Sequence, residues 1–566
     1  MEMLRKGLRS GGRRSATVSR VGGRVARAGA VSLLVLAGFS ASLLAARPSH
    51  GTIATTTSAS STTTVSTAPS VLVVTGHGWG HGLGMSQWGA YGYAQHGFTY
   101  NRILAHYYPN TVLAHAPGRT LRVLVAQAKT VTLGSTGGWS AIDATGTRVP
   151  LDPGTVDLGA ALTLASHPEL SPPFSFTSPT PLTVNGHAYR GKLVVSSDGK
   201  QVSVIDSVGL EPYLKGVVPA EMPSTWPAAA LEAQAVAARS YALANLVKTG
   251  PFDLYGDSRS QVYGGVAVES AATNSAVDAT SGMVVQYDGK VADTLFHSSS
   301  GGRTVSSLEA TGVAVPYLVS VPDPYDTLSP LHDWGPVLLD ATRVQKALKL
   351  TSAISGLTAT DGPSGRVKSL EVTTDDDAPT SFTGNEVRFA LGLRSTWFQP
   401  ALLGLRSTAR TVAYGGAATL LGTVDGATGV TVEAKPSGTL DWAPAGSPVP
   451  APDGTFSLSV KPRLVTSYRL AYGDVRVGLA TVAVAARVTA ASSSSGITGT
   501  VKPATAGAQV QLLQRSDGAW VVASSTVTDA VGGFGFGGSP AAGTYRVRVT
   551  PGHGIAPGLS RPLAVP

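Results

Sequence analysis

One acidic residue, Glu221, stands in a setting that could perform acid–base chemistry. It lies in the segment VVPAEMPSTWPAAALEAQAVAARSYALA, residues 217–244, between apolar residues and two prolines and ahead of an alanine-rich stretch. A carboxyl group that loses hydration in such a setting favours its neutral form, which raises its pKa. A carboxylic acid with a raised pKa can protonate a glycosidic oxygen near neutral pH. The plainer alternative is a solvated acid at a helix start, where it complements the helix dipole.

Several further motifs occur along the same chain. They are LEPYLKGVVPAEMPSTWPAAALEAQAVAARSYAL around Glu221, SQVYGG at 260–265, FHSSSGGRT at 296–304, PYLVSVPDPYD at 316–326, GLRSTWF at 392–398 and GHGWGHGLGMSQWGAYGYAQHGF at 76–98. Several ordered motifs are a far more specific signal than one short pattern. Over roughly residues 71–400 the chain resembles the SpoIID/LytB family (stage II sporulation protein D / amidase enhancer).

The resemblance implies that Glu221 is the catalytic acid of a lytic transglycosylase that acts on the glycan strands of peptidoglycan. The acid would protonate the oxygen that leaves C1 of N-acetylmuramic acid. The resulting carboxylate would then take the proton of the C6 hydroxyl, which closes a 1,6-anhydro ring. The residues expected to contact substrate are His81, Gln87, Trp88, Gln234, Arg239, Tyr241, Gln261, Tyr263, His297 and Ser300.

This chemistry needs one carboxyl group, whereas a hydrolase needs a second one at a defined separation. The nearby acids are Glu211, Glu232 and Asp206. Glu211 precedes a proline and is expected to open a short helix. Glu232 lies inside the long helix and is expected to face solvent. The one-acid interpretation therefore stands.

Helix spacing places Gln234, Ala238 and Tyr241 on one face, where the two polar side chains could bind N-acetyl groups. Core packing of an alanine-rich helix is the alternative role for Tyr241. His77 and His81 are four residues apart, but the five glycines of GHGWGHGLG argue against a helix and against a helical metal site. The family motif favours His81. In many relatives this segment ends the domain, so here it must dock back beside Glu221.

No cofactor or metal is expected. The chain has no cysteine, which excludes disulfides and thiolate metal ligands. Some relatives bind zinc through Cys and His just before the QVYGG phrase, but FDLYGDSRSQVYGG at 252–265 contains neither residue.

The N-terminus predicts export. Residues 1–47 are expected to be a signal peptide or an N-terminal membrane anchor, because eight Lys and Arg precede an apolar run at 28–46. This segment accounts for most of the net charge of +9, so bulk charge does not indicate nucleic-acid binding. We expect an extracytoplasmic location, either secreted to the cell wall or anchored to the outer face of the cytoplasmic membrane.

The 566 residues predict several domains. A Ser/Thr-rich linker at 48–70 precedes an α+β catalytic domain at 71–400, with mixed sheets and one long Ala-rich helix from about Pro227 to Lys248. An internal repeat, in which GTVDGATGVTVEAK resembles GTVKPATAGAQVQLLQR, predicts two small all-β Ig-like sandwich modules. These are the first module, 401–487, and the second module, 497–566, joined by ASSSSG at 491–496.

Three functions fit these features. The first is a lytic transglycosylase, and Glu221 favours it. The second is a non-catalytic amidase enhancer that binds the wall and stimulates an N-acetylmuramoyl-L-alanine amidase. The third is a plain wall-binding scaffold, which would depend on the β repeats alone. The partners expected are glycan strands and a cell-wall amidase, with no nucleic acid.

Overall fold

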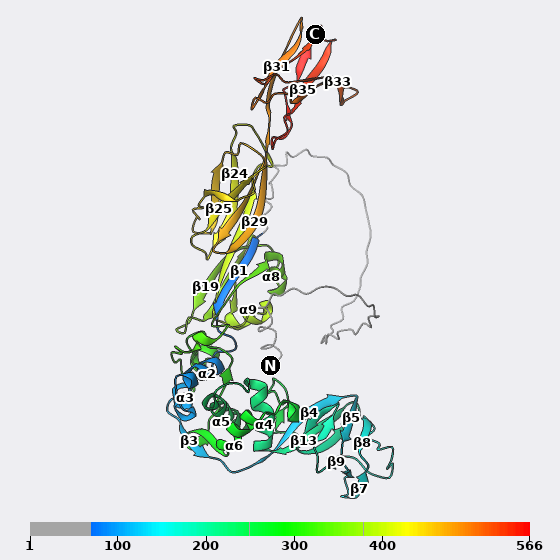
Figure 1. Cartoon of the computed structure of the whole chain (residues 1–566), viewed down its shortest axis with the longest axis vertical. Helices are drawn as coiled ribbons and strands as arrows, with labels where there is room; N and C mark the ends of the chain where they lie inside the picture. Colours follow the sequence, from blue (N-terminus) through cyan, green and yellow to red (C-terminus); the bar gives the residue numbers. More distant parts are fainter. Residues whose placement is uncertain (1–69, 248, 377) are drawn as a thin grey trace, which may run out of the picture. The chain divides into compact units, whose positions relative to one another are not determined.

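The computed structural model describes residues 70–566, except positions 248 and 377. Within these residues it contains eight α-helices and many strands in several sheets, so the chain mixes α and β structure (Figure 1). The N-terminal segment 1–47 and nearly all of the linker 48–70 lie outside the described residues. None of the helices in the described part combines the length and the apolar character that a membrane crossing needs.

The strands between residues 120 and 208, joined by β14, form two sheets. The larger sheet has the order β14 (Leu254–Tyr255), β4 (Thr120–Ala128), β13 (Val202–Gly209), β12 (Lys192–Ser197), β9 (Phe174–Thr177), β6 (Trp139–Ile142) and β7 (Arg148–Leu151). The smaller has the order β11 (His187–Tyr189), β10 (Leu182–Val184), β5 (Thr130–Ser135) and β8 (Gly154–Gly159). Alternating apolar residues from both sheets enter one core, which also receives helix α4 (Leu210–Glu221).

The helices that surround Glu221 form a second core next to this one. They are α2 (Gln87–Gln95), α3 (Tyr100–Tyr107), α5 (Ala228–Ala244) and α6 (Ala271–Ala279). The same part of the chain also contains the short helix α7 (Ser307–Thr311) and the 3₁₀ turns η1 (Gly265–Val268) and η2 (Asp326–Leu328). Short strands accompany them: β2 (Met85–Ser86) with β17 (Phe296–His297), and β3 (Val112–His115) with β15 (Met283–Tyr287) and β16 (Lys290–Val291). A turn at Asp288 and Gly289, both with positive φ, joins β15 to β16.

Helix α5 is the longest helix of the described part, as its alanine content predicts. It begins at Ala228 after Pro227, close to the predicted start. It ends at Ala244, earlier than the prediction of Lys248. The reason is Asn245, whose side-chain amide donates to the Tyr241 carbonyl and to Asp293 and so caps the helix end.

The first described strand, β1 (Ser70–His77), is the second strand of a five-stranded sheet. It pairs antiparallel with β18 (Asp333–Asp340) and with β22 (Phe398–Ser407), and the sheet continues through β24 (Ala418–Asp425) and β27 (Thr455–Val460). Against it lie α8 (Ala341–Ala347), α9 (Gly384–Leu391) and the sheet β19 (Ile354–Asp361), β20 (Val367–Thr374) and β21 (Thr380–Thr383). Helix α9 starts with a Thr383–Glu386 capping box.

The boundary predicted at residues 400 and 401 falls inside β22, which is continuous from Phe398 to Ser407. The same strand pairs with β1 at one edge and with β24 at the other. The sheet therefore runs without a break from the part that holds Glu221 into the first module. The domain boundaries as such stay predictions.

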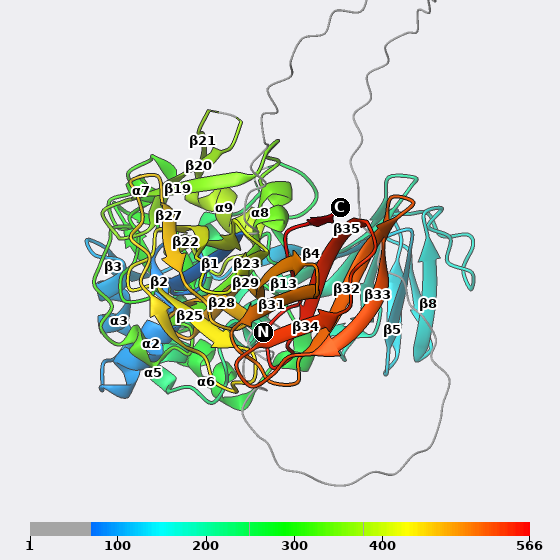
Figure 2. The same cartoon turned by 90° about the horizontal axis from the view of Figure 1, so that it is seen from above.

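The remaining strands belong to three sheets. The first has the order β23 (Thr411–Ala413), β29 (Val475–Ala485), β28 (Thr466–Tyr472), β25 (Thr431–Pro436) and β26 (Ala443–Gly446). The second has β30 (Arg487–Ser493), β31 (Gly496–Lys502) and β34 (Gly533–Gly537). The third has β33 (Ala519–Val527), β32 (Gln509–Ser516), β35 (Gly543–Thr550), β36 (Gly558–Leu559) and β37 (Leu563–Val565). Figure 2 labels β32, β33 and β35 of this sheet.

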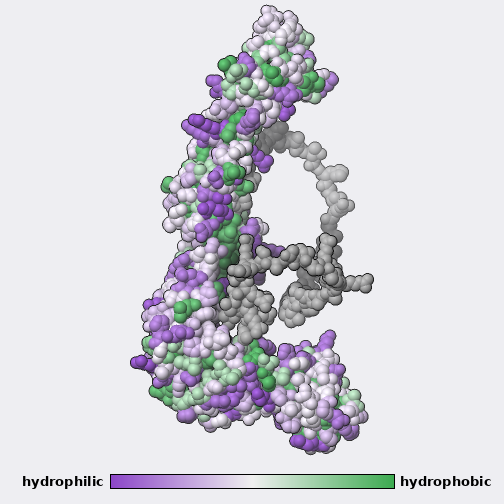
Figure 3. All heavy atoms as spheres, viewed as in Figure 1, coloured by the Kyte–Doolittle hydropathy of each residue, from purple (hydrophilic) through white to green (hydrophobic). Residues whose placement is uncertain are grey.

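The stretch ASSSSG at 491–496 is not a linker, which corrects the expectation. Strands β30 and β31 pair along their whole length from Arg487–Lys502 to Ser493–Gly496, so the serines form the tip of a hairpin. Small polar residues suit a turn as well as a linker, and the sequence alone does not separate the two. On the face of the molecule shown in Figure 3, hydrophobic residues occur in small patches among hydrophilic ones.

Candidate functional site

Glu221 is the last residue of helix α4, and its position follows from two prolines. Pro223 disfavours helical backbone at Met222, which is extended with φ −124° and ψ 142°. Pro219, inside the last turn, has no N–H to continue the hydrogen-bond ladder. The acid therefore lies at the end of a helix and not at a start, which corrects the plainer alternative considered above. The negative end of the helix dipole disfavours a carboxylate there.

The Glu221 side chain is partly buried and is held by a residue from a distant segment. Burial raises the pKa of Glu221, while hydrogen bonds from the Gln87 side chain and the Val262 backbone act in the opposite direction. The Gln87 Nε2 atom donates to Glu221 Oε2 at 3.3 Å. Gln87 is itself 6% exposed, so this amide is fixed in the interior. The glycine-rich segment thus docks beside Glu221, as the sequence predicts.

A buried carboxylate, Asp326, holds that segment in place. Its oxygens accept from Ser86 Oγ (2.8 Å), Ser299 Oγ (2.8 Å), Ser300 N (2.9 Å) and Gly301 N (2.9 Å), and His332 Nδ1 lies at 3.1 Å. Ser86 is the N-cap of α2, whose first residue is Gln87. The PDPYD phrase therefore fixes the helix start that presents Gln87 to Glu221. The sequence analysis did not assign Asp326 a role.

Glycines allow the segment to approach its neighbours closely at two positions. Gly84 has φ +67°, and a Cβ there would lie 1.9 Å from the Leu295 carbonyl oxygen. A Cβ on Gly89 would lie 2.0 Å from the Tyr107 hydroxyl. Only glycine fits both places without a backbone shift.

Three aromatic side chains cluster next to the residues that flank Glu221. Trp88 contacts Tyr91 and Trp226 with ring centroids 5.5 and 4.9 Å apart, and Tyr91 lies 4.9 Å from Trp226. All three are partly exposed. The sequence analysis named Trp88 but missed Tyr91 and Trp226, although a tryptophan between prolines five residues after the acid was a usable signal.

Tyr241 lies between two carboxyl groups. Burial raises the pKa of Tyr241, and the charges of Asp293 and Glu221 raise it further. Burial also raises the pKa of Asp293, which accepts a hydrogen bond of 2.7 Å from Asn245. Asp293 is the second carboxyl of this region, and the sequence analysis missed it because 72 positions separate it from Glu221 in the chain.

His81 and His297 are neighbours, with ring centroids 5.5 Å apart. His81 Nδ1 accepts from the Leu83 N–H at 3.0 Å, and His297 Nδ1 lies 3.0 Å from the Leu83 carbonyl. Loss of hydration and the charge of Arg388 lower the pKa of His81 to about 4, although the residue is partly accessible to solvent. Burial likewise lowers the pKa of His297, so both rings favour the neutral form.

His81 lines a cavity of about 500 Å³ in which basic groups predominate. The lining includes Arg366, Lys368, Arg388 and the acid Glu309. Arg366 is 3% exposed, and its Nε and Nη1 atoms have no hydrogen-bond partner. Glu221 is not among the residues that line this cavity. His77, by contrast, pairs with the exposed Asp333 at 2.6 Å on the outside.

Arg239, Tyr263 and Ser300 are buried, and each is hydrogen-bonded to a carboxyl group, so that a contact of these residues with substrate stays a prediction. Arg239 is 0% exposed and forms a two-pronged ion pair with Glu211 at 2.9 and 2.6 Å. The Tyr263 hydroxyl donates to the buried Asp206 at 2.9 Å. The Ser300 hydroxyl donates to Asp323 Oδ2 at 2.8 Å. Sequence spacing does not show these partners, because each comes from a distant segment.

Gln234 and Gln261 also lie in the interior. Gln261 donates to the Ala238 carbonyl at 3.2 Å and accepts from the Tyr213 hydroxyl at 3.3 Å. Gln234 is 0% exposed, and neither polar atom of its amide has a hydrogen-bond partner. A direct substrate contact of either residue stays a prediction. Glu232 is partly buried, not fully solvated as expected, and burial raises its pKa.

The two acids of segment 252–265 form ion pairs with arginines. Asp253 pairs with Arg122 at 2.8 Å, and Asp257 pairs with Arg259 at 2.8 Å. Over the described residues, no three His, Cys, Asp or Glu side chains gather as a metal site would require. Independence from metal stays a prediction.

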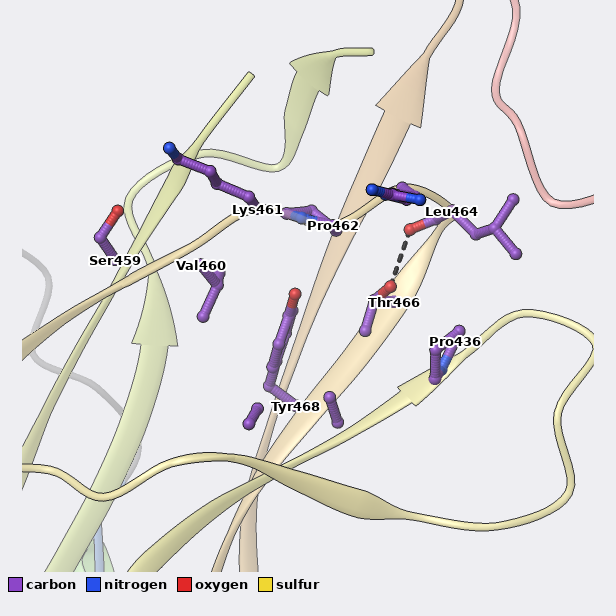
Figure 4. A pocket seen from close by; sticks show the side chains of 11 residues that line it. Pro436, Ser459, Val460, Lys461, Pro462, Leu464, Thr466 and Tyr468 are labelled. Carbon is purple, nitrogen blue, oxygen red and sulfur yellow. Dashed lines mark hydrogen bonds between the residues drawn. The ribbon is translucent and has the colours of Figure 1, made fainter. Parts of the chain in front are cut away.

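A cavity of about 750 Å³ lies in the first module (Figure 4). The ring of Tyr468 faces it, and the Thr466 hydroxyl donates to the Leu464 carbonyl at 2.7 Å. None of its lining residues is an acid or a histidine. This cavity therefore offers no group for acid–base catalysis near neutral pH.

The comparisons with known proteins place the Glu221 region in a family. Residues 198–287, which hold α4 and α5, match the family SpoIID, described as "Stage II sporulation protein". The chain is 38% identical over 159 residues to the "Amidase enhancer" of Bacillus subtilis (strain 168), covering 28% of this chain and 21% of that protein. It is 29% identical over 228 residues to "Stage II sporulation protein D" of the same organism, covering 37% and 66%.

A third relative is the "Uncharacterized protein BHWA1_00569" of Brachyspira hyodysenteriae, 41% identical over 142 residues, or 25% of this chain and 39% of that protein. Among solved structures, murine CEACAM1b aligns with a TM-score of 0.15 and 13% identity over 29% of this chain and 98% of that chain. The matches to the curated relatives span less than two thirds of their lengths. Through the region that contains Glu221, the chain is thus similar to the SpoIID/LytB family, and these matches support the resemblance seen in the sequence motifs.

Proposed function

We propose that this chain is an exported lytic transglycosylase that cleaves the bond between N-acetylmuramic acid and N-acetylglucosamine in peptidoglycan. The observation that carries the proposal is the partly buried Glu221 carboxyl at the end of α4, held by Gln87 and with a raised pKa. Such a group is protonated near neutral pH more often than an ordinary glutamate. It can therefore give a proton to the leaving glycosidic oxygen.

The surroundings of Glu221 support the second half of the reaction as well. After it gives its proton, the carboxylate takes the proton of the C6 hydroxyl, and that oxygen closes on C1 to give the 1,6-anhydro product. Gln87 keeps the carboxyl in one orientation through both steps. The partly exposed rings of Trp88, Tyr91 and Trp226 offer apolar faces on which sugar rings can stack.

A second candidate is a non-catalytic enhancer of a cell-wall amidase. The observation that favours it is the 38% identity to the protein named "Amidase enhancer". In that case the aromatic cluster at Trp88 would bind glycan and Glu221 would have no chemical role. We place a role in sporulation under this second candidate as well, because two relatives carry sporulation names.

The deciding experiment is mass spectrometry of the products from peptide-free glycan strands, with wild type and Glu221→Gln. Wild type should release 1,6-anhydro ends. The variant should be slower by at least about 10²-fold, because general acid–base catalysis contributes 10²–10⁴-fold. Glu232→Gln is the matched control, since Glu232 is another partly buried acid with a raised pKa. It should keep wild-type activity.

Other results would change the assignment. Reducing ends instead of anhydro ends would indicate a hydrolase, with Asp293 as the candidate second carboxyl. Equal rates for wild type and Glu221→Gln would remove Glu221 from the chemistry. No products from either form, combined with stimulation of an amidase by both, would establish the enhancer.

We also propose that the two C-terminal repeats are Ig-like sandwich modules outside the cytoplasmic membrane. The equivalent strand pairs of both repeats, β25 with β28 and β32 with β35, support a common framework. Fractionation of cells that produce the full chain, with protease added to intact cells from which the wall has been removed, tests this location. Protection from protease would contradict it.

A further inference from the structure

The two C-terminal modules present the same pair of side chains on the same face. In the first module the Arg469 guanidinium lies 4.1 Å from the ring centroid of Trp442. In the second module the Arg546 guanidinium lies 5.0 Å from the ring centroid of Trp520. The four residues occupy equivalent positions, because Arg469 follows Tyr468 on β28 just as Arg546 follows Tyr545 on β35.

The strand registers show which residue faces each arginine. In the first module Arg469 is directly opposite Glu433. In the second module Arg546 is directly opposite Leu513. Directly opposite residues of an antiparallel pair lie on the same face with their side chains in contact range. The second module therefore has a leucine where the first has a carboxylate.

In the first module this carboxylate satisfies two arginines. Glu433 Oε2 lies 2.7 Å from Arg469 Nε and 3.2 Å from Arg476 Nε. The positive charges beside Trp442 are thus compensated within the chain. The arrangement shows that the space between two arginines and the tryptophan accommodates a carboxylate.

The second module also has two arginines but lacks the acid, and its second arginine, Arg548, stands at the position of Ala471, the residue opposite Arg476 in the first module. Arg548 lies two residues after Arg546 on β35, so both side chains are on one face of the sheet. Over the described part of the chain, neither forms an ion pair, and the buried Nε of Arg546 has no hydrogen-bond partner. A buried guanidinium N–H without an acceptor is unfavourable, and an anion would remove that cost.

A cavity of about 480 Å³ lies at this place. Its lining consists of Gln511, Leu513, Trp520, Val522, Arg546, Arg548, Pro557 and Leu559. Two charges are positive, none is negative, and most of the other lining side chains are apolar. Val522 is 50% exposed and Leu559 is 53% exposed, so the apolar wall is open to a ligand.

We propose that the second module binds a carboxylate-bearing sugar of the wall glycan in this cavity. The carboxylate takes the place that Glu433 occupies in the first module, between Arg546 and Arg548. The apolar wall of Leu513, Val522 and Leu559 receives the C–H face of the sugar. The site is independent of Glu221, so the proposal holds whether the chain is an enzyme or an amidase enhancer.

The test is a saturation-transfer NMR titration of the full chain with N-acetylmuramic acid and, as its matched control ligand, N-acetylglucosamine. The two sugars differ in the lactyl ether that carries the carboxylate. N-acetylmuramic acid should bind at least about tenfold more tightly, as expected when a ligand forms hydrogen bonds with a charged group. Equal affinities would overturn the proposal. Tighter binding of N-acetylglucosamine 6-phosphate than of N-acetylmuramic acid would also overturn it and assign the site to phosphate-bearing polymers.

Substitutions locate the binding. Leu513→Glu installs the carboxylate of the first module and should abolish binding, whereas Leu513→Gln, of the same shape without the charge, should retain it. Arg546→Gln and Arg548→Gln should each weaken binding about tenfold or more. Unchanged thermal unfolding of each variant shows that the module is folded. Arg469→Gln, the equivalent change in the first module, should bind as wild type does, and an equal loss of binding there would refute the assignment to the second module.

Discussion

Replacing Asp326 by asparagine should loosen the loops that present Gln87 to Glu221. The carboxylate is 0% exposed and accepts from donors in three segments of the chain. The asparagine oxygen can still accept from Ser86 and Ser300, which use Oδ1 in the wild type. The new NH₂ group then faces donors that had used Oδ2.

The magnitude follows from the donors that lose an acceptor. Ser299 can rotate its hydroxyl, but the Gly301 N–H and His332 Nδ1 cannot change their roles so easily. Each buried donor left without a partner costs about 1–3 kcal/mol. For these two donors the sum is about 2–6 kcal/mol, a range that contains the cost of about 3–5 kcal/mol for breaking a buried ion pair.

Hydrogen exchange followed by mass spectrometry measures this loss locally. Peptides that cover residues 83–91 and 296–303 should exchange faster in Asp326→Asn, and glycan cutting should fall with them. Asp333→Asn is the control, because Asp333 pairs with His77 on the surface, where its side chain is 72% exposed. That change should cost less than about 1 kcal/mol. Unchanged exchange in Asp326→Asn would refute the conclusion that hydrogen bonds to Asp326 hold these two loops in place.

Three further predictions concern pH, a buried ion pair and metal. The hydrogen bond to Asp326 raises the pKa of His332, so the stabilising effect of His332 is present below the ordinary pKa of histidine and is lost as the pH rises through the raised value. His332→Gln should therefore lower the melting temperature more at pH 5.5 than at pH 8.5, and an equal loss at both pH values would contradict this. Arg239→Met should lower the free energy of unfolding, measured with denaturant, by about 3–5 kcal/mol because it leaves the Glu211 carboxylate without its partner. Its control Arg259→Met, where the arginine side chain is 58% exposed, should lower it by less than about 1 kcal/mol, and similar values for both would show that the burial of Arg239 is unimportant. Glycan cutting should survive EDTA, and a loss that zinc restores would reveal a metal site.

The sequence by itself determined the local features. The prolines at 219 and 223 end helix α4 at Glu221, and the alanines after Pro227 make α5, because backbone preferences act within a few residues. The Asp288-Gly289 turn has the same origin. The motifs also led to the family resemblance, and the internal repeat of the C-terminal part was readable from the sequence alone.

Only the tertiary structure decided which side chains surround Glu221. Gln87 is 134 positions away in the chain, and no local rule predicts that its amide meets the carboxyl. Arg239 and Ser300 stand in motifs that look functional, yet burial turns one into the partner of Glu211 and the other into a support for Asp323. Burial and long-range hydrogen bonds depend on how distant segments pack, and for that reason the sequence could propose the acid but not its surroundings.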